Sequence, residues 1–171
     1  AVGRYATGYG ELYPGAGPGA GAYDVVIGCG TGLTGGDGAV RLEGARAEAW
    51  WEGRTISLLP CKETEQFFAE PYFALAMARI ECHYFMHNVF LEPAQILQDA
   101  YKLKDIPGVI VHGRYDVVCA VDNALALHGV WPQADLHIIQ DAGHAASEPG
   151  IVDALVSATR DMARKLKLGA A

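Results

Sequence analysis

The 171-residue chain has few charged residues and no long hydrophobic run. Charged residues make up only 19% of it and hydrophobic residues 51%, a composition that excludes a disordered protein and indicates a globular one. No uninterrupted apolar stretch approaches the roughly 20 residues needed to cross a bilayer. The chain also lacks a basic and then apolar signal peptide. We therefore expect a folded cytoplasmic protein with no membrane partner.

Positive charge and cysteine are also scarce. Thirteen Lys and Arg residues stand against 20 Asp and Glu residues, which gives a formal net charge of −7. This balance argues against nucleic acid as a partner, because a polyanion attracts basic surfaces. The four cysteines, Cys29, Cys61, Cys82 and Cys119, form no C-x-x-C pair. Their spacing therefore disfavours a zinc ribbon or a dithiol redox motif.

Glycine is concentrated near the N-terminus, and this bias distinguishes the first part of the chain from the rest. Thirteen of the 21 glycines fall within the first 38 residues, together with Pro14 and Pro18. Glycine and proline both disfavour regular structure, so we expect loops there. We predict three parts, namely the glycine-rich segment 1–38, a helical portion 39–104, and an α/β portion 105–171.

The middle portion has the pattern of several helices. Val40–Glu52 is rich in helix-forming residues and contains no proline. Pro71 suits the first turn of a helix over 71–87, and a third helix is expected to start near Pro93. Apolar residues at three- and four-residue steps support the last two helices. These stripes are Phe73, Met77, Ile80 and Tyr84, and then Ile96, Leu97, Ala100 and Tyr101.

The last third of the chain alternates strands and helices. Val109–Val111 is a short β-branched run typical of a buried strand, and Leu136–Ile139 is expected to be a second buried strand, whereas Val121–Val130 and Gly150–Leu168 have helical patterns. This alternation predicts a βαβ unit with parallel strands. The carboxyl ends of both strands then lie at one edge of the sheet, where open parallel sheets place their ligands and catalytic groups.

An acid and a base follow the two predicted strands. Asp116 comes shortly after the first strand and His144 shortly after the second. Because neighbouring strands lie about 5 Å apart, the two side chains can meet, and a carboxylate then orients an imidazole to act as a base. The order Asp and then His is also that of α/β-hydrolases. Spacing alone leaves another interpretation open, in which Asp116 caps the next helix and His144 is a simple loop residue.

Several motifs together resemble one peptidase family. They are G-R-Y-D-V-V-C at 113–119, D-A-G-H at 141–144, A-R-I-E-x-H-Y-F at 78–85, W-E-G at 51–53, L-T-G-G-D at 33–37 and E-P-G-I at 148–151. In this order they resemble proline iminopeptidase, a serine peptidase with the α/β-hydrolase fold. The resemblance extends from about Gly32 to about Lys165.

The resemblance implies a role for four side chains. Asp116 matches the acid of the catalytic triad and His144 matches its general base. Glu52 and Glu81 match two carboxylates that hold the free amine of a peptide beginning with proline. Two acceptors suit a secondary ammonium, which has two N–H donors. No metal or organic cofactor is implied. Without the resemblance, Glu52 and Glu81 also fit ordinary helix surface residues.

The serine expected of this family has no match in the chain. The family carries it in a G-x-S-x-G turn upstream of the acid. Ser57, Ser147 and Ser157 are the only serines, and none is flanked by glycines in this way. We therefore expect the chain to match the C-terminal portion of the fold, with helices of the cap domain, and to be inactive alone. Ala120 and Ala145 replace the proline and serine that are common in the family.

Three other interpretations of the sequence remain open. The segment Asp24–Gly32 ends in G-x-G-x-G, which resembles the cofactor-binding turn of S-adenosylmethionine methyltransferases. The chain is alternatively a non-catalytic peptide-binding remnant that uses Glu52 and Glu81. His83 and His87 have the i, i+4 spacing of metal ligands, but no third ligand accompanies them.

Overall fold

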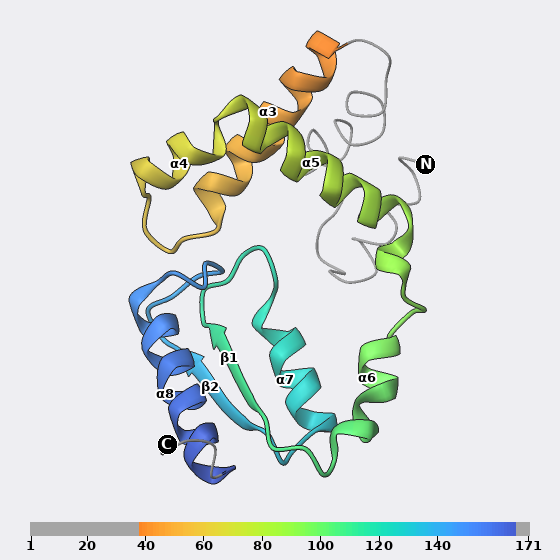
Figure 1. Ribbon diagram of the computed structural model, residues 1–171, viewed down its shortest axis with the longest axis vertical. Coiled ribbons are helices and arrows are strands. Elements are labelled where there is room, and N and C mark those ends of the chain that lie inside the picture. Colours follow the sequence, from red (N-terminus) through yellow and green to blue (C-terminus); the bar gives the residue numbers. More distant parts are fainter. Residues whose placement is uncertain (1–37, 167–171) are drawn as a thin grey trace. The chain divides into compact units, whose positions relative to one another are not determined.

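The computed structural model describes residues 38–166, which form parts of two compact units (Figure 1). Of the described residues, 38–54 and Cys61–Glu92 belong to the first unit. Thr55–Pro60 and residues 93–166 belong to the second. Among the described residues, no helix has the length and apolar character needed to cross a membrane.

The described part of the first unit is helical. It contains α3 (Gly38–Thr55), α4 (Lys62–Phe68), α5 (Pro71–Met86) and the short 3-10 helix η2 (Asn88–Phe90). The helices expected over Val40–Glu52 and 71–87 are thus confirmed, whereas the seven-residue α4 has no strong signal in the sequence. α5 begins at Pro71 because the Glu70 side chain accepts a 2.8 Å hydrogen bond from the Phe73 amide.

Small side chains form the core of this unit. Ala45 and Ala49 of α3 and Ala74, Ala78 and Cys82 of α5 make one buried cluster. The apolar stripe that the sequence shows on α5 is not its most buried face. Ile80 and Tyr84, two members of that stripe, are 59% and 46% exposed, whereas Met77 packs against the edge of the cluster. Alanines at four-residue steps allow two helix backbones to approach closely, and the larger side chains lie beside this contact.

The second unit contains a pair of parallel strands with helices on either side. Its elements are α6 (Gln95–Asp99), the 3-10 helix η3 (Ala100–Leu103), β1 (Val109–Gly113), α7 (Val121–Val130), β2 (Asp135–Ile139) and α8 (Pro149–Lys165). β1 and β2 pair in parallel, from Val109 opposite Asp135 to Gly113 opposite Ile139. In Figure 1, α7 and α8 lie on opposite sides of these strands. The predicted βαβ arrangement is confirmed.

The helix expected near Pro93 differs from its prediction. It begins at Gln95, after Ala94 adopts a left-handed conformation with φ 56°, and it changes to a 3-10 helix at Ala100. Of the predicted stripe only Ala100 is buried, and Tyr101 is 65% exposed. The change of helix type alters the angle between successive side chains, so that a stripe with α-helical spacing no longer faces one side.

Candidate active site

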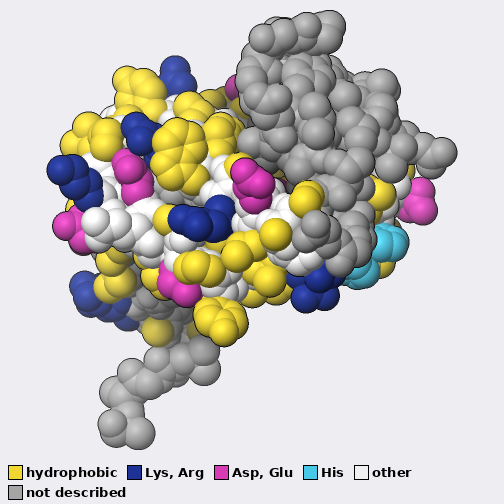
Figure 2. All heavy atoms as spheres, turned by 90° about the horizontal axis from the view of Figure 1, so that it is seen from above, with side chains coloured by type: hydrophobic (Ala, Val, Ile, Leu, Met, Phe, Trp, Pro, Cys, Tyr) yellow, Lys and Arg dark blue, Asp and Glu magenta, His cyan; other side chains and the backbone are white. Residues whose placement is uncertain are grey.

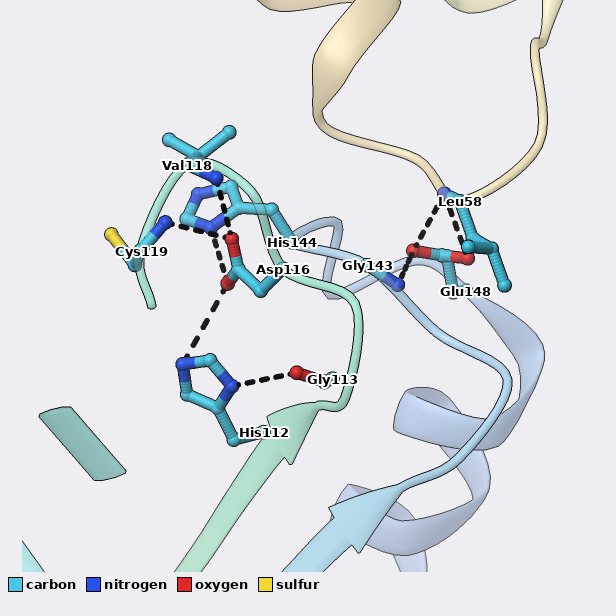
Figure 3. Close-up of polar contacts among 9 residues, drawn as sticks. All are labelled: Leu58, His112, Gly113, Asp116, Val118, Cys119, Gly143, His144 and Glu148. Carbon is cyan, nitrogen blue, oxygen red and sulfur yellow. Dashed lines mark hydrogen bonds and ion pairs between the residues drawn. The ribbon is translucent and has the colours of Figure 1, made fainter. Parts of the chain in front are cut away.

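Asp116 and His144 meet just beyond the ends of β1 and β2 (Figure 3). The Nδ1 atom of His144 donates to Oδ2 of Asp116 over 2.9 Å. The Asp116 side chain is 4% exposed, whereas that of His144 is 38% exposed. A buried carboxylate therefore orients an imidazole whose other face remains accessible. Within residues 38–166, no side chain forms a hydrogen bond with His144 Nε2.

Two backbone hydrogen bonds bring the two loops together. The Arg114 amide donates to the Ile139 carbonyl over 2.8 Å, and the Tyr115 amide donates to the Ala142 carbonyl over 3.0 Å. Gly113 makes this approach possible, because a Cβ atom there would lie 1.9 Å from the Gly143 carbonyl oxygen. The loops after β1 and β2 are therefore joined directly, and this contact positions the acid beside the base.

The other oxygen of Asp116 fixes its own loop. Oδ1 accepts hydrogen bonds from the amides of Val118 (2.9 Å) and Cys119 (2.7 Å). Asp116 is not the capping residue of α7, because that residue is Ala120. The interpretation of Asp116 as a helix cap is therefore wrong, and the bond to Asp116 makes His144 more than a simple loop residue.

A second histidine approaches the same carboxylate. His112 Nε2 lies 3.7 Å from Asp116 Oδ2, while its Nδ1 donates to the Gly113 carbonyl over 2.9 Å. This side chain is mostly buried at the end of β1. His112 is not among the residues expected from the sequence to form the site. Its position directly before the G-R-Y-D motif was the available signal, since side chains at a strand's carboxyl end face the site.

In the first unit, carboxylates of α3 and α5 influence one another. Glu52 and Glu81 are half-buried, and the neighbouring Glu48 is only 3% exposed. Burial, and then the negative charges of Glu81 and Glu52, together raise the pKa of Glu48 from 4.5 to about 8. Burial and then the charge of Glu52 raise the pKa of Glu81 to about 7.

This carboxylate group, Glu48, Glu52 and Glu81, has the chemistry of a cation-binding site. Close carboxylates that are partly withdrawn from water repel one another, and an organic cation placed among them relieves this repulsion. The structure brings Glu52 and Glu81 together, as the family resemblance implies, and adds Glu48. Glu48 lies one helical turn before Glu52 on α3, and this i, i+4 spacing was a usable signal in the sequence.

The histidine pair on α5 has local contacts instead of a metal-binding arrangement. The His83 and His87 rings lie 4.5 Å apart between their centres. His87 Nδ1 donates to the His83 carbonyl over 2.6 Å, which occupies one of its two ring nitrogens. Between residues 38 and 166, no group of three or more potential ligands has the geometry to bind a metal ion. The segment Asp24–Gly32, considered for cofactor binding, lies outside the described residues.

Comparison with known proteins identifies relatives over about three quarters of the chain. The proline iminopeptidase of Xylella fastidiosa (strain 9a5c) is 52% identical over 128 residues, which are 74% of this chain and 41% of that protein. A probable proline iminopeptidase of Leptolyngbya boryana is 45% identical over 74% of this chain and 40% of its own length. The proline iminopeptidase of Arabidopsis thaliana is 43% identical over 72% of this chain and 33% of its own length.

The matched region covers only part of these relatives. The chain spans about two fifths of the bacterial relatives and one third of the plant relative. No family model matches the chain. The parallel strands with flanking helices are compatible with the C-terminal part of an α/β-hydrolase fold. The identities of 43–52% over nearly three quarters of its length show that this chain belongs to the proline iminopeptidase family.

Proposed function

We propose that these 171 residues supply the acid, the base and the amine-binding carboxylates of a serine peptidase that releases N-terminal proline from peptides. The observation that carries this proposal is the 2.9 Å hydrogen bond between His144 and the buried Asp116. The relatives are named proline iminopeptidases, and from this name we take both the reaction, release of an N-terminal residue, and the identity of that residue, proline.

In the proposed mechanism, His144 acts as a general base and then as a general acid. Asp116 holds the Nδ1–H of the imidazole, which leaves the lone pair of Nε2 for the proton of a serine hydroxyl. That oxygen attacks the prolyl carbonyl, and the imidazolium then protonates the leaving amine as the C–N bond breaks. The bond to Asp116 stabilises the imidazolium formed between these two steps. A water molecule activated by His144 hydrolyses the resulting prolyl–serine ester and releases proline.

We further propose that the serine comes from a segment outside these 171 residues. None of Ser57, Ser147 and Ser157 lies in a G-x-S-x-G turn. In this proposal, α3, α4 and α5 belong to the cap domain of the whole enzyme. The strands β1 and β2, with α7 and α8, form the end of its hydrolase sheet.

The proposed role of Glu52 and Glu81 is to hold the prolyl ammonium. Their half-buried position weakens competition from water, and the neighbouring Glu48 adds negative charge once it is ionised. A bound cation favours the ionised carboxylates, so binding of the ammonium lowers the pKa values of Glu48 and Glu81. Prolinamide affinity is therefore expected to rise several-fold between pH 6 and pH 8, until the ligand's own amine loses its proton.

A chimaera tests the catalytic proposal. The upstream portion of the Xylella fastidiosa relative is joined to the matched portion of this chain, and release of p-nitroaniline from proline p-nitroanilide is measured. We expect turnover that disappears with His144→Ala. Glu52→Gln and Glu81→Gln are expected to raise KM at least tenfold, because each removes one acceptor for the ammonium. A folded chimaera whose turnover survives His144→Ala would contradict the proposed base.

A non-catalytic peptide-binding protein is the second candidate, favoured by the lack of a G-x-S-x-G turn in the chain. Calorimetric titration of the 171-residue chain with a Pro-Ala dipeptide separates the two candidates. If the second function is correct, the chain binds the dipeptide, Glu81→Gln weakens this binding, and the chimaera shows no peptidase activity. The absence of binding heat across pH 6–8 would exclude it.

A further inference from the structure

One carboxylate outside the proposed triad contacts two distant parts of the second unit (Figure 3). Glu148 precedes α8, and its Oε1 atom accepts a 2.6 Å hydrogen bond from the Gly143 amide. The Leu58 amide donates to the same carboxylate, at 3.3 Å from Oε2 and 3.4 Å from Oε1. Glu148 thereby joins the loop that carries His144 to a segment 90 residues earlier in the chain.

The same segment also binds the backbone of the histidine loop. The amides of His144 and Ala145 both donate to the Ile56 carbonyl, over 2.8 and 2.7 Å. The backbone amides of three consecutive residues, Gly143 to Ala145, are therefore all held by Glu148 or by Ile56. Hydrogen bonds to a charged acceptor are stronger than those between neutral groups, so the Glu148 contact is expected to contribute most.

The contact is tightly packed. A Cβ atom on Gly143 would lie 3.0 Å from the Leu58 nitrogen, 3.1 Å from Glu148 Oε1 and 3.2 Å from the Ile56 carbonyl oxygen. A side chain at this position would require these atoms to move apart by a few tenths of an ångström. The arrangement therefore leaves the histidine loop little freedom to shift.

We propose that Glu148 is a positioning residue for His144, an inference that rests on the proposed function. Glu148 contacts neither the imidazole nor Asp116, and it acts by fixing the backbone from which the imidazole projects. The segment that it binds follows α3 directly, the helix that carries Glu52 and ends at Thr55.

Proton NMR of the 171-residue chain tests this role. The Nδ1–H proton of His144 is expected far downfield because of its bond to Asp116, and its exchange with water reports how firmly the ring is held. We expect Glu148→Ala to accelerate the exchange of this proton and of the Gly143 amide at least tenfold. Glu148→Gln keeps one acceptor oxygen and is expected to have a smaller effect. Asp153→Asn, an exposed substitution on α8, is the matched control and is expected to change neither rate.

A second variant covers the case in which Glu148→Ala does not fold. Gly143→Ala pushes Leu58 and Glu148 apart without removing a charge, and it is expected to accelerate the same two exchange rates. In the chimaera, Glu148→Ala is expected to lower kcat at least tenfold while KM changes less than twofold, because the base is displaced and the amine-binding carboxylates are not.

The outcomes separate this inference from the proposed function. A His144 Nδ1–H signal that exchanges at the wild-type rate in folded Glu148→Ala or Gly143→Ala protein would overturn the positioning role. Asp116→Asn is expected to remove that signal. A signal that survives Asp116→Asn would instead disprove the proposed acid–base pair, whatever Glu148 does.

Discussion

The two carboxylate oxygens of Asp116 have different hydrogen-bond partners, so the contribution of Asp116 to turnover can be tested by substitution. Oδ1 fixes the loop before α7, whereas Oδ2 binds His144. Asp116→Asn keeps the shape and one acceptor oxygen but removes the charge that stabilises the imidazolium. In the chimaera, we expect turnover to fall about 10⁴-fold, as it does when a triad acid is replaced by its amide.

His112 provides the matched control for this prediction. It lies at the same carboxylate, but at 3.7 Å its contact is too long for a strong hydrogen bond. His112→Gln is therefore expected to lower turnover less than tenfold. Equal losses in the Asp116 and His112 variants, each with an unchanged circular dichroism spectrum, would argue against a specific acid–base role of Asp116.

Glu48 gives the first unit a pH-dependent stability. Its pKa is about 8 in the folded chain and near 4.5 when exposed, so the folded state binds the proton more tightly. Between these values, the free energy of unfolding falls as pH rises, because the unfolded state releases the proton first. Glu48→Gln removes this penalty and is expected to stabilise the chain by about 1–3 kcal/mol at pH 8, with little effect at pH 4.5.

Urea unfolding followed by tryptophan fluorescence measures this effect, because Trp50 and Trp51 lie on the same helix as Glu48. Glu43→Gln is the control, since Glu43 is an exposed residue of α3. The free energy of unfolding of the Glu43→Gln variant is expected to change with pH as that of the wild type does. If Glu48→Gln also followed the wild-type curve, burial of the Glu48 carboxyl group would not be the cause of that dependence.

At the scale of elements, one glycine in α7 and one in α8 differ in the space available for a side chain. A Cβ atom on Gly150, near the start of α8, would lie 2.6 Å from Ile139 Cγ2 of β2. A Cβ atom on Gly129 of α7 would have no neighbour within 4 Å. Gly150→Ala is thus expected to destabilise the second unit by about 1–3 kcal/mol through overpacking.

Gly129→Ala is expected to have the opposite sign. It adds a better helix former in open space, so we expect a gain of about 0.5–1 kcal/mol. Urea unfolding of both variants, followed through Trp131, measures the difference. Destabilisation by Gly129→Ala as large as that by Gly150→Ala would show that helix–strand packing does not determine the effect.

The sequence predicts the second unit better than the first. Short β-branched runs and proline at a helix start leave few alternatives for β1, β2 and α8, and the joined loops follow from parallel pairing. In α5, periodicity indicated a helix but not its buried face. Ala74, Ala78 and Cys82 are buried in place of the larger residues, and this choice depends on α3, which lies elsewhere in the sequence.

The candidate site shows the same contrast between local and distant determinants. Asp116 and His144 are predictable because each follows a strand and belongs to a recognisable motif. The Ile56 carbonyl and the Leu58 amide act through the backbone, so no side-chain pattern indicates them. The effect of Glu81 on the pKa of Glu48 requires the packing of two helices and is likewise absent from local sequence.

At the scale of the whole chain, large apolar side chains reach the surface in both units. Tyr72 of α5, Leu59 after α3 and Val117 after β1 are among the most exposed. Figure 2 shows hydrophobic side chains over much of one face, mixed with charges of both signs. Among the described residues, β1 and β2 have only one another as strand partners, so each has an edge without a neighbour. Such edges and apolar surfaces favour association with further protein.

If an upstream portion completes the fold, it covers part of this apolar surface and pairs with a free strand edge. The 171-residue chain is then expected to bind the apolar dye ANS, with a fluorescence several-fold higher per mole than that of the chimaera. Gel filtration at rising concentration is expected to show self-association of the chain but not of the chimaera, because an unpaired edge invites strand addition. Equal dye fluorescence in two folded, monomeric samples would show that the upstream portion covers none of this surface. The serine would then have to reach His144 without extending the sheet formed by β1 and β2.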